Sequence, residues 1–226
     1  MTVGRFALGF VAAGGLTLVS AAPPPKATPV SPVFRLVQSG DLDGLKATLA
    51  ADPALANTVN ASGLTPLGFA LSRKNSGALL ALLLSGADPN TPFGPTHMRP
   101  LQGAAMRNLP EIVDALLARG ADPKGKDNNG GTALHEAANL GAVDIASKIA
   151  GKGADVNAAY TAGPNAGATP VHLAAKTKNM LMIIVLAAHH PNWDLKWKGK
   201  TPAELADDAG GKDVGDYIRS RQRAKP

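Results

Sequence analysis

The sequence contains no cysteine and few aromatic residues. None of its 226 residues is Cys, and only 4% are Phe, Trp or Tyr. The missing thiols exclude disulfides, a thiolate nucleophile, a cysteine-based metal site and lipid attachment to a cysteine after a leader. Because hydrophobic residues still make up 45% of the chain, a core must be built mainly from Leu, Ala, Val and Ile, and the length requires no second domain.

Residue patterns typical of catalysis or metal binding are also lacking. Five histidines are present, but no Ser-His-Asp order, paired carboxylates or Gly-rich phosphate loop accompanies them. His189 and His190 are adjacent on a predicted helix and point in different directions. His97 has no Asp, Glu or second His at ligand spacing. The sequence therefore predicts no catalytic residue, no metal ligand and no cofactor, and we expect a protein that is not an enzyme.

What the chain does contain is a repeated motif. A fixed period of 34 and then 33 residues separates Gly86-Ala87-Asp88, Gly120-Ala121-Asp122 and Gly153-Ala154-Asp155. A period of this size indicates stacked copies of one supersecondary unit. A second motif opens the first helix of each unit, at Thr65-Pro66-Leu67, Met98-Arg99-Pro100-Leu101, Gly131-Thr132-Ala133-Leu134-His135 and Ala168-Thr169-Pro170-Val171-His172.

These motifs resemble the ankyrin repeat family, whose units open with Thr-Pro-Leu-His-x-Ala on a period of about 33. Degenerate copies around Pro32 and Pro202 extend the resemblance to about six units over residues 31–218. The resemblance implies an all-α repeat solenoid of helix-turn-helix units with β-hairpin fingers, capped by its degenerate end units. It also implies binding to other proteins. The units, numbered one to six, begin at Pro32, Pro66, Pro100, Ala133, Pro170 and Pro202.

Each recurring residue type has a physical role. Thr can cap a free amide at the helix start, and the Pro after it suits the first turn. Four positions after each unit start, side chains that are small in five of six units let helices approach: Leu36, Ala70, Ala104, Ala137, Ala174 and Ala206. Eight positions after it we expect a left-handed turn, which Gly and Asn tolerate, at Gly40, Lys74, Asn108, Gly141, Lys178 and Gly210. The resemblance implies that His135 and His172 bond locally with Thr132 and Thr169.

Residues 1–22 have the layout of a secretory signal peptide. Arg5 precedes an apolar run over residues 6–19, and small residues follow up to Ala22. A membrane anchor is the alternative, but the run is shorter than the roughly 20 residues that a spanning helix needs. We therefore expect cleavage after Ala21 or Ala22, a Pro-rich linker over residues 23–30, and a periplasmic or secreted bacterial protein.

The net charge of +6 is partly concentrated near the C-terminus. Lys196, Lys198 and Lys200 lie in one finger, and residues 219–226 are predicted to form a basic tail. Such side chains attract an acidic partner or an anionic envelope polymer, although a solvated cap and tail would have the same composition. Nucleic acid is not expected, because no aromatic residues alternate with the charges of the tail.

Without catalytic residues, the function must lie in a surface. The resemblance implies binding through the fingers and the exposed ends of the first helices, which line a concave face. Met106 and Leu140 are apolar where solvent is expected, and Met and Arg are over-represented at interface centres. Single exposed apolar residues are nevertheless common. The helix candidates are Ser72, Arg73, Met106, Arg107, Asn139, Leu140 and Lys176.

Three aromatic residues complete the predicted site from the fingers. Tyr160 lies in a finger with four extra residues before Pro170, and insertions of this kind often project from the binding face. Phe93 lies in a finger that is one residue longer than its counterparts. We expect Trp193 to pack against the cap, and Trp197, flanked by lysines, to contact the partner.

The sequence thus predicts a protein-binding module of the periplasm, monomeric when free. It would bind one envelope or secreted protein, and either support a periplasmic enzyme or neutralise a toxic hydrolase as an immunity protein. Both roles use the same face, so the sequence leaves both open. The alternative is a binder of anionic envelope polymer through the basic finger and tail. No contact with the membrane is expected after signal cleavage.

Overall fold

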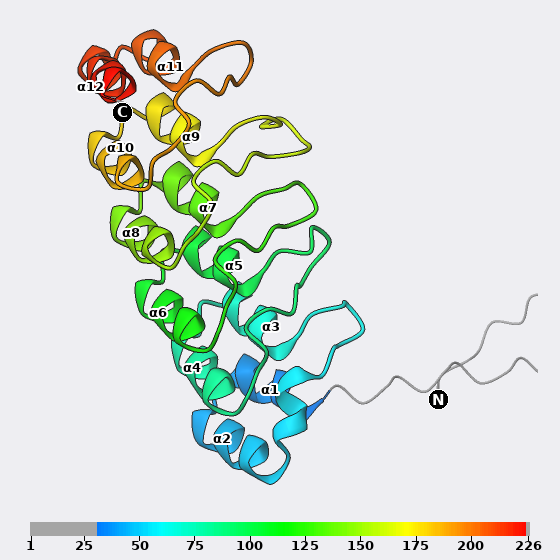
Figure 1. Cartoon of the computed structure of the whole chain (residues 1–226). Coiled ribbons are helices and arrows are strands. Elements are labelled where there is room, and N and C mark those ends of the chain that lie inside the picture. Colours follow the sequence, from blue (N-terminus) through cyan, green and yellow to red (C-terminus); the bar gives the residue numbers. More distant parts are fainter. Residues whose placement is uncertain (1–30, 225–226) are drawn as a thin grey trace, which may run out of the picture.

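The computed structural model describes residues 31–224, which form a curved stack of paired helices (Figure 1). The first helix of each unit lies in an inner row: α1 (Pro32–Ser39), α3 (Pro66–Ser72), α5 (Pro100–Met106), α7 (Ala133–Leu140), α9 (Pro170–Lys176) and α11 (Pro202–Asp208). The second helix lies in an outer row: α2 (Leu42–Ala51), α4 (Ser76–Leu84), α6 (Pro110–Ala118), α8 (Val143–Gly151), α10 (Met180–Ala187) and α12 (Lys212–Arg223). A 3₁₀ turn, η1 (Pro53–Asn57), follows α2. The predicted all-α solenoid is confirmed.

The predicted signal peptide (residues 1–22) and linker (23–30) lie outside the described residues, as do residues 225 and 226. Export and signal cleavage therefore stay predictions.

The inner helices begin where the repeated motif places them. The Thr65 hydroxyl accepts a hydrogen bond from the Gly68 amide at 3.1 Å, and α3 begins at the next residue, Pro66. The Thr201 hydroxyl caps α11 in the same way, through the Glu204 amide at 3.4 Å. Each bond satisfies an amide that the first turn of a helix leaves free. The motif thus fixes the start of the inner row locally.

The predicted left-handed position occurs in all six units. The φ angles there are 76°, 53°, 55°, 75°, 56° and 79°, at Gly40, Lys74, Asn108, Gly141, Lys178 and Gly210. A side chain with a Cβ rarely adopts this conformation, yet Lys74 and Lys178 do so because the next helix must start there. The turn between inner and outer helix is therefore set by the repeat rather than by glycine.

One continuous core fills the space between the two rows. Ala70, Ala104, Ala137, Ala174 and Ala206 are fully buried, and the partly buried Leu36 packs against the same core in the first unit. The small side chains let consecutive inner helices pack against each other, and the outer helices do likewise. No single unit could bury these surfaces alone, so neighbouring units stabilise each other.

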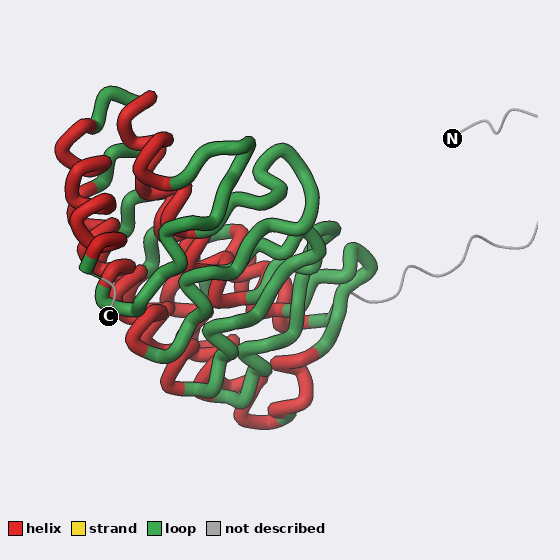
Figure 2. The backbone as a smooth tube through the Cα atoms, turned by 45° about the horizontal axis from the view of Figure 1, so that its top comes forward, coloured by secondary structure: helices red, strands yellow, loops and turns green. Residues whose placement is uncertain are grey.

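The connections from the outer row to the next unit lie side by side as a layer of fingers (Figure 2). Within residues 31–224 they contain only isolated β-bridges, Phe93 with Met98 and Trp197 with Lys200, where hairpins were expected. Asparagines join successive fingers. The Asn57 side chain accepts the Asp88 amide at 2.8 Å and donates to the Gly86 carbonyl at 3.0 Å.

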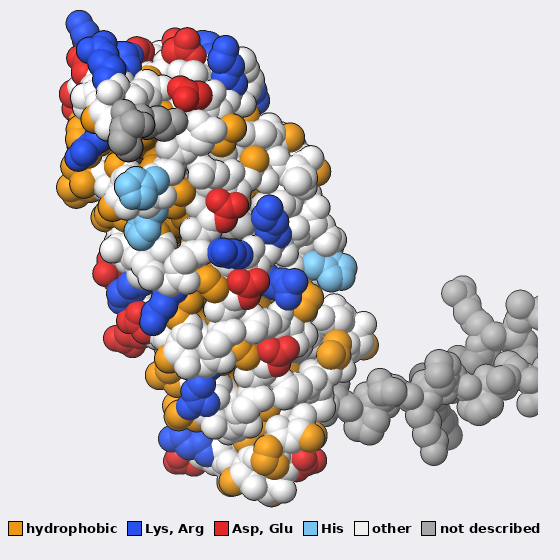
Figure 3. Space-filling model, in the orientation of Figure 1, with side chains coloured by type: hydrophobic (Ala, Val, Ile, Leu, Met, Phe, Trp, Pro, Cys, Tyr) orange, Lys and Arg blue, Asp and Glu red, His pale blue; other side chains and the backbone are white. Residues whose placement is uncertain are grey.

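The C-terminal end differs from the prediction. Helix α12 extends to Arg223, so the predicted boundary between residues 218 and 219 falls inside it. The Arg219 guanidinium lies 2.6 Å from both the Asp207 and the Asp216 carboxylates. Figure 3 shows acidic and basic side chains interleaved at this end of the molecule. Residues 219–223 are therefore helix with partly paired charges, not a free basic tail.

Candidate functional site

The C-terminal ends of the inner helices form a surface that we call the inner face. Its members are the seven helix candidates of the sequence: Ser72, Arg73, Met106, Arg107, Asn139, Leu140 and Lys176. Met106 is 39% and Leu140 51% exposed, and the others are exposed except Arg107, which is half-buried. Because α3, α5, α7 and α9 pack in sequence, these residues form one continuous surface across four units.

Two arginines occupy the N-terminal half of the inner face. The Arg73 guanidinium lies 4.8 Å from the centre of the Phe69 ring, a cation–π contact that orients the charge at little entropic cost. Arg107 donates to the Gly103 carbonyl at 3.2 Å. Partial burial lowers the pKa of Arg107, but an arginine remains cationic at neutral pH. Neither guanidinium forms an ion pair among the described residues.

Two lysines lie together at the other end of the inner face. The Lys176 ammonium is 5.6 Å and the Lys198 ammonium 5.0 Å from the centre of the same indole ring, that of Trp197. Lys176 ends α9, whereas Lys198 comes from the following finger. The ring therefore brings two cations from separate elements to one place.

Tyr160 connects the long finger to the inner helix α7. Its ring centre lies 4.3 Å from that of His135, and its hydroxyl donates to Glu136 Oε1 at 3.4 Å. Burial raises the pKa of both Tyr160 and Glu136. The finger is also held by the preceding one, because the Thr161 amide donates to the Asn129 carbonyl at 2.7 Å. The long finger is thus fastened to the N-terminal half of α7 and to the preceding finger.

This arrangement agrees with comparisons with known proteins. A family model described as "Ankyrin repeats (3 copies)" matches residues 74–160. The human Cyclin-dependent kinase 4 inhibitor B is 34% identical over 122 residues, which is 53% of this chain and 85% of that protein. The chain belongs to the ankyrin repeat family. Another relative, the mouse NF-kappa-B inhibitor delta, is 37% identical over 84 residues, 37% of this chain and 25% of that protein.

Solved structures agree with this assignment. An ankyrin repeat domain from Acinetobacter baumannii AYE has a TM-score of 0.76 at 25% identity, over 84% of this chain and 97% of that one. The ankyrin repeat domain of Bcl-3 has a TM-score of 0.74 at 20% identity, over 85% of this chain and 86% of that one. The second likeness concerns the fold alone. Ankyrin repeats mediate protein–protein interactions, and several of the relatives are named as inhibitors.

Two of the finger aromatics are placed differently from the prediction. Trp197 is only 3% exposed and Phe93 only 8%. The Phe93 ring packs over Gly68 and Gly103, where a Cβ would lie 2.6 Å and 3.0 Å from ring atoms. Trp197 lies beneath its two lysines and beside His172. The prediction that Phe93 and Trp197 offer contact surface is therefore corrected, because both rings fill space between ankyrin units. Trp193 is buried, as expected.

The two motif histidines join successive ankyrin units. In His135, Nδ1 accepts from the Thr132 amide at 3.2 Å, and Nε2 donates to the Ala168 carbonyl of the next unit at 3.2 Å. Burial lowers the pKa of His135 to about 4, so the ring is neutral at pH 7. His172 repeats this bridge to the Leu195 carbonyl at 3.0 Å, and burial lowers its pKa as well. The expected structural role is confirmed.

A third bridge of the same kind was not predicted from the sequence. Gln102 accepts from the Arg99 amide at 2.9 Å and donates to the Gly131 carbonyl at 2.8 Å. It is fully buried at the place that His135 and His172 hold in their units. The signal was available, because Gln102 is the third residue of its helix, as each histidine is. An amide can thus replace the imidazole in this fold.

A second apolar surface, also missed, lies on the outer row. Leu84 is 71%, Leu181 64%, Ile184 44% and Leu80 37% exposed, on α4 and α10. Both helices are apolar on all sides, which is the available signal. Figure 3 shows hydrophobic side chains along this edge near α10. The acidic residues Asp114 and Asp144 of α6 and α8 separate the two groups and share Lys148.

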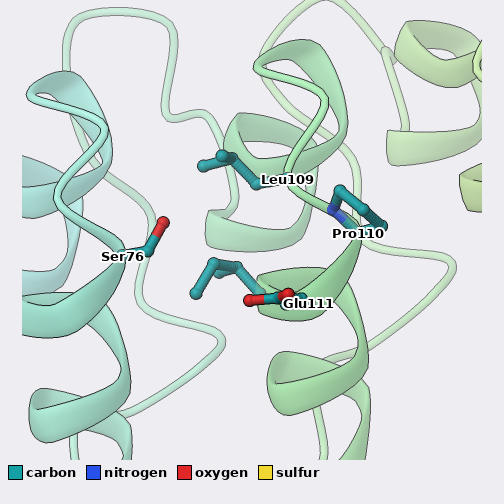
Figure 4. A pocket seen from close by; sticks show the side chains of 5 residues that line it. Ser76, Leu109, Pro110 and Glu111 are labelled. Atoms are coloured by element: carbon teal, nitrogen blue, oxygen red, sulfur yellow. The ribbon is translucent and has the colours of Figure 1, made fainter.

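No three His, Cys, Asp or Glu side chains among the described residues are placed to hold a metal ion, and no described helix is long and apolar enough to cross a membrane. A hollow of about 140 Å³ between α4 and α6 is lined by Ser76, Leu109, Pro110, Glu111 and Ile112 (Figure 4). Sites for drug-sized ligands start at about 300 Å³.

Proposed function

We propose that this ankyrin protein is an exported binding module without catalytic activity, which holds one envelope or secreted protein on its inner face. The observation that carries the proposal is the exposure of Met106 and Leu140 on neighbouring inner helices, beside two arginines that form no ion pair within residues 31–224. An apolar centre with Met and Arg is typical of the part of an interface that contributes most binding energy. The Tyr160 finger is fastened to α7, the helix that carries Leu140.

Within that function, the inhibitory role has additional support. The human relative is named an inhibitor of cyclin-dependent kinase 4 and the mouse relative an inhibitor of NF-kappa-B. Occluding a toxic hydrolase would use the same kind of rigid, preformed surface. Supporting a periplasmic enzyme is the other role, and an assay of the captured partner with and without this protein separates the two. Inhibition supports an immunity function, whereas activation or protection from unfolding supports a helper function.

The inner-face proposal is tested by paired substitutions. The mature chain captures its partner from an envelope extract, the partner is identified, and its Kd is measured for Met106→Ala with Arg107→Ala. Truncation of a central anchor costs about 2 kcal/mol or more, about 30-fold in Kd. A second variant shortens the long finger by deleting residues 162–166. The control, Leu84→Ala with Lys152→Ala, removes the same kinds of side chain from the outer row.

The outcome is read together with thermal melting. If both inner-face variants stay folded and bind as tightly as the parent, the inner face is not the site. Salt-sensitive binding to purified cell wall, without a saturable protein complex, would instead favour the anionic polymer. Among the described residues of the basic finger and α12, Lys196, Lys198, Arg221 and Arg223 form no ion pair and are the cations that such binding would use, since Lys200 and Arg219 already pair with Asp208 and Asp207.

Export has its own test. The intact mass of protein extracted from the envelope should match a chain that begins after Ala21 or Ala22. A mass that includes Met1, or recovery with the cytoplasmic fraction, contradicts the periplasmic part of the proposal. The binding function can hold in either compartment.

A further inference from the structure

The inner face and its border carry an excess of positive charge. Arg73, Arg107, Lys176 and Lys198 project there, and none forms an ion pair among residues 31–224. Three other cations, Lys148, Lys200 and Arg219, account for all the ion pairs of the described chain. The inner face therefore presents free positive charge.

The carboxylates nearby are already engaged. Glu136 accepts the Tyr160 hydroxyl. Asp127 Oδ1 accepts the amides of Asn129 and Gly131, each at 2.8 Å. Asp208, at the end of α11, pairs with Lys200. An acidic partner would find four cations here that form no ion pair within residues 31–224, whereas the nearby carboxylates already accept hydrogen bonds or pair with a lysine.

A structural explanation accounts for only part of this pattern. Cations near the C-terminus of a helix are favoured by the helix dipole, and Arg73, Arg107 and Lys176 lie at such ends. The dipole does not explain Lys198, which belongs to a finger. Nor does it explain Met106 and Leu140, which are exposed between the cationic ends. Apolar side chains between two cationic pairs are the complement of a ligand with the opposite charges.

The spacing favours an extended ligand. Packed helices lie about 8–10 Å apart, so the distance from α3 to α9 is about 25–30 Å. A strand-like segment rises about 3.3 Å per residue, so eight or nine residues would span the inner face. Such a segment would place carboxylates near Arg73 and Arg107 at one end, and near Lys176 and Lys198 at the other. Its middle would lie over Met106 and Leu140.

We propose that the inner face binds an extended acidic segment of the partner protein, with carboxylates on both sides of a central apolar side chain. This inference rests on the proposed function, because it assumes that the partner is a protein bound at the inner face. It adds the chemistry of the bound segment. A polysaccharide anion has no use for the apolar centre, which is why the observations favour a peptide.

Selection of peptides by the intact mature chain tests the chemistry directly. A phage library displaying random peptides of about twelve residues covers the length estimated from the strand rise. Enriched sequences should carry Asp or Glu on both sides of Leu, Ile, Met or Phe. Enrichment of basic or uncharged peptides, or no enrichment at all, overturns the proposal.

Charge reversal then locates the site. Arg73→Glu with Lys176→Glu changes two exposed residues and should weaken the selected peptide by about tenfold or more at low salt, where exposed charges interact most strongly. The neutral pair Arg73→Gln with Lys176→Gln should give an intermediate loss. Lys46→Glu with Lys152→Glu makes the same change of net charge on the outer row and should have little effect. An equal loss in this control overturns the assignment to the inner face.

Two further comparisons separate this inference from the proposed function. Suppose that Met106→Ala with Leu140→Ala weakens binding of the natural partner, while Arg73→Glu with Lys176→Glu leaves its Kd unchanged. Protein binding at the inner face then stands and the acidic segment falls. If every inner-face variant binds the natural partner as tightly as the parent does, although acidic peptides bind at the inner face, the proposed function is wrong. Equal competition by a polysaccharide polyanion and by the peptide would assign the cations to an anionic polymer instead.

Discussion

The junction between units two and three and the junction between units four and five fill the same space with different chemistry. In the first, Gly68 is the third residue of its helix, and the Phe93 ring of the next finger occupies the space beside it. In the second, His135 holds that helix position, and Tyr160 holds the finger position. The first junction is filled by an apolar ring, whereas the second is joined by the hydrogen bonds of the His135 imidazole.

The contribution of each junction to the stability of this solenoid should therefore depend on pH to a different extent. In repeat proteins, stability is approximately a sum of unit terms and nearest-neighbour interface terms. The Phe93 junction contains no titratable side chain at this place, whereas the His135 junction contains one with a strongly lowered pKa. Acid should therefore loosen the C-terminal half before the N-terminal half. Substitutions at each junction can test this.

The largest effect is expected from Phe93→Ala. The ring is 8% exposed and packs over two glycines that cannot fill the gap. Removing a buried Phe costs about 3–5 kcal/mol of unfolding free energy, which urea denaturation measures. Tyr160→Phe is the matched control. It keeps the ring and removes only the long bond to Glu136, so about 1 kcal/mol or less is expected. Similar losses in both variants would mean that the Phe93 ring does not seal its junction.

A smaller loss of stability, confined to acidic pH, is expected from protonation of His135. Its pKa is about 4 in the folded state against an ordinary 6.5, so the unfolded chain binds a proton first as the pH falls. Stability is then full above pH 6.5 and decreases between pH 6.5 and 4, by about 3 kcal/mol. The lowered pKa of His172 acts in the same direction. The raised pKa of Glu136 acts oppositely just above its ordinary 4.5.

The chain itself supplies the control for this titration. Gln102 makes both bonds of the bridge without a titratable group, so His135→Gln with His172→Gln should fold and should lose most of this decrease. Urea denaturation at about pH 7 and pH 4.5, either side of the ordinary His pKa, measures it. Hydrogen exchange by peptide should show α7 to α10 opening first in the parent at the lower pH. An unchanged pH dependence in the double variant would assign it to other groups.

The two junctions also show which features can be predicted from the sequence. The helix starts and the left-handed turns were predictable because each depends on neighbours within one turn, even where Lys74 and Lys178 replace glycine. The burial of Phe93 was not predictable from its own finger, because it depends on Gly68 and Gly103 in the inner helices on either side. A hint was present. Phe93, Tyr160 and Trp197 each stand five residues after Asp88, Asp155 and Asn192, and recurrence at one phase of a repeat indicates a structural role.

The exposure of Met106 and Leu140 could also be predicted from the repeat. The position of Met106 is exposed in all six units and that of Leu140 in four of them, so an apolar residue there departs from the pattern. The free charges of Arg73 and Lys176 could not be predicted, because whether a cation is paired depends on side chains in other units. The candidate site was thus located by the sequence, while its chemistry came from the structure.

The smallest expected effect is a gain in stability, from a substitution in the fingers. Asn57 and Asn90 each accept the amide of the residue at the Asp position of the next unit, and Asn157 does the same for Asn192 at 2.6 Å. Lys124 stands at this place between them, and an ammonium cannot accept a hydrogen bond. Lys124→Asn should therefore accept the Asp155 amide and donate to the Gly153 carbonyl. A net hydrogen bond contributes about 0.5–1.5 kcal/mol, so the free energy of unfolding should rise by this amount, which urea denaturation measures as a higher midpoint at an unchanged m-value. Lys124→Gln, whose amide is one carbon farther from the backbone, should gain less. If the two variants gain equally, removal of the lysine charge and not the asparagine bond is the cause.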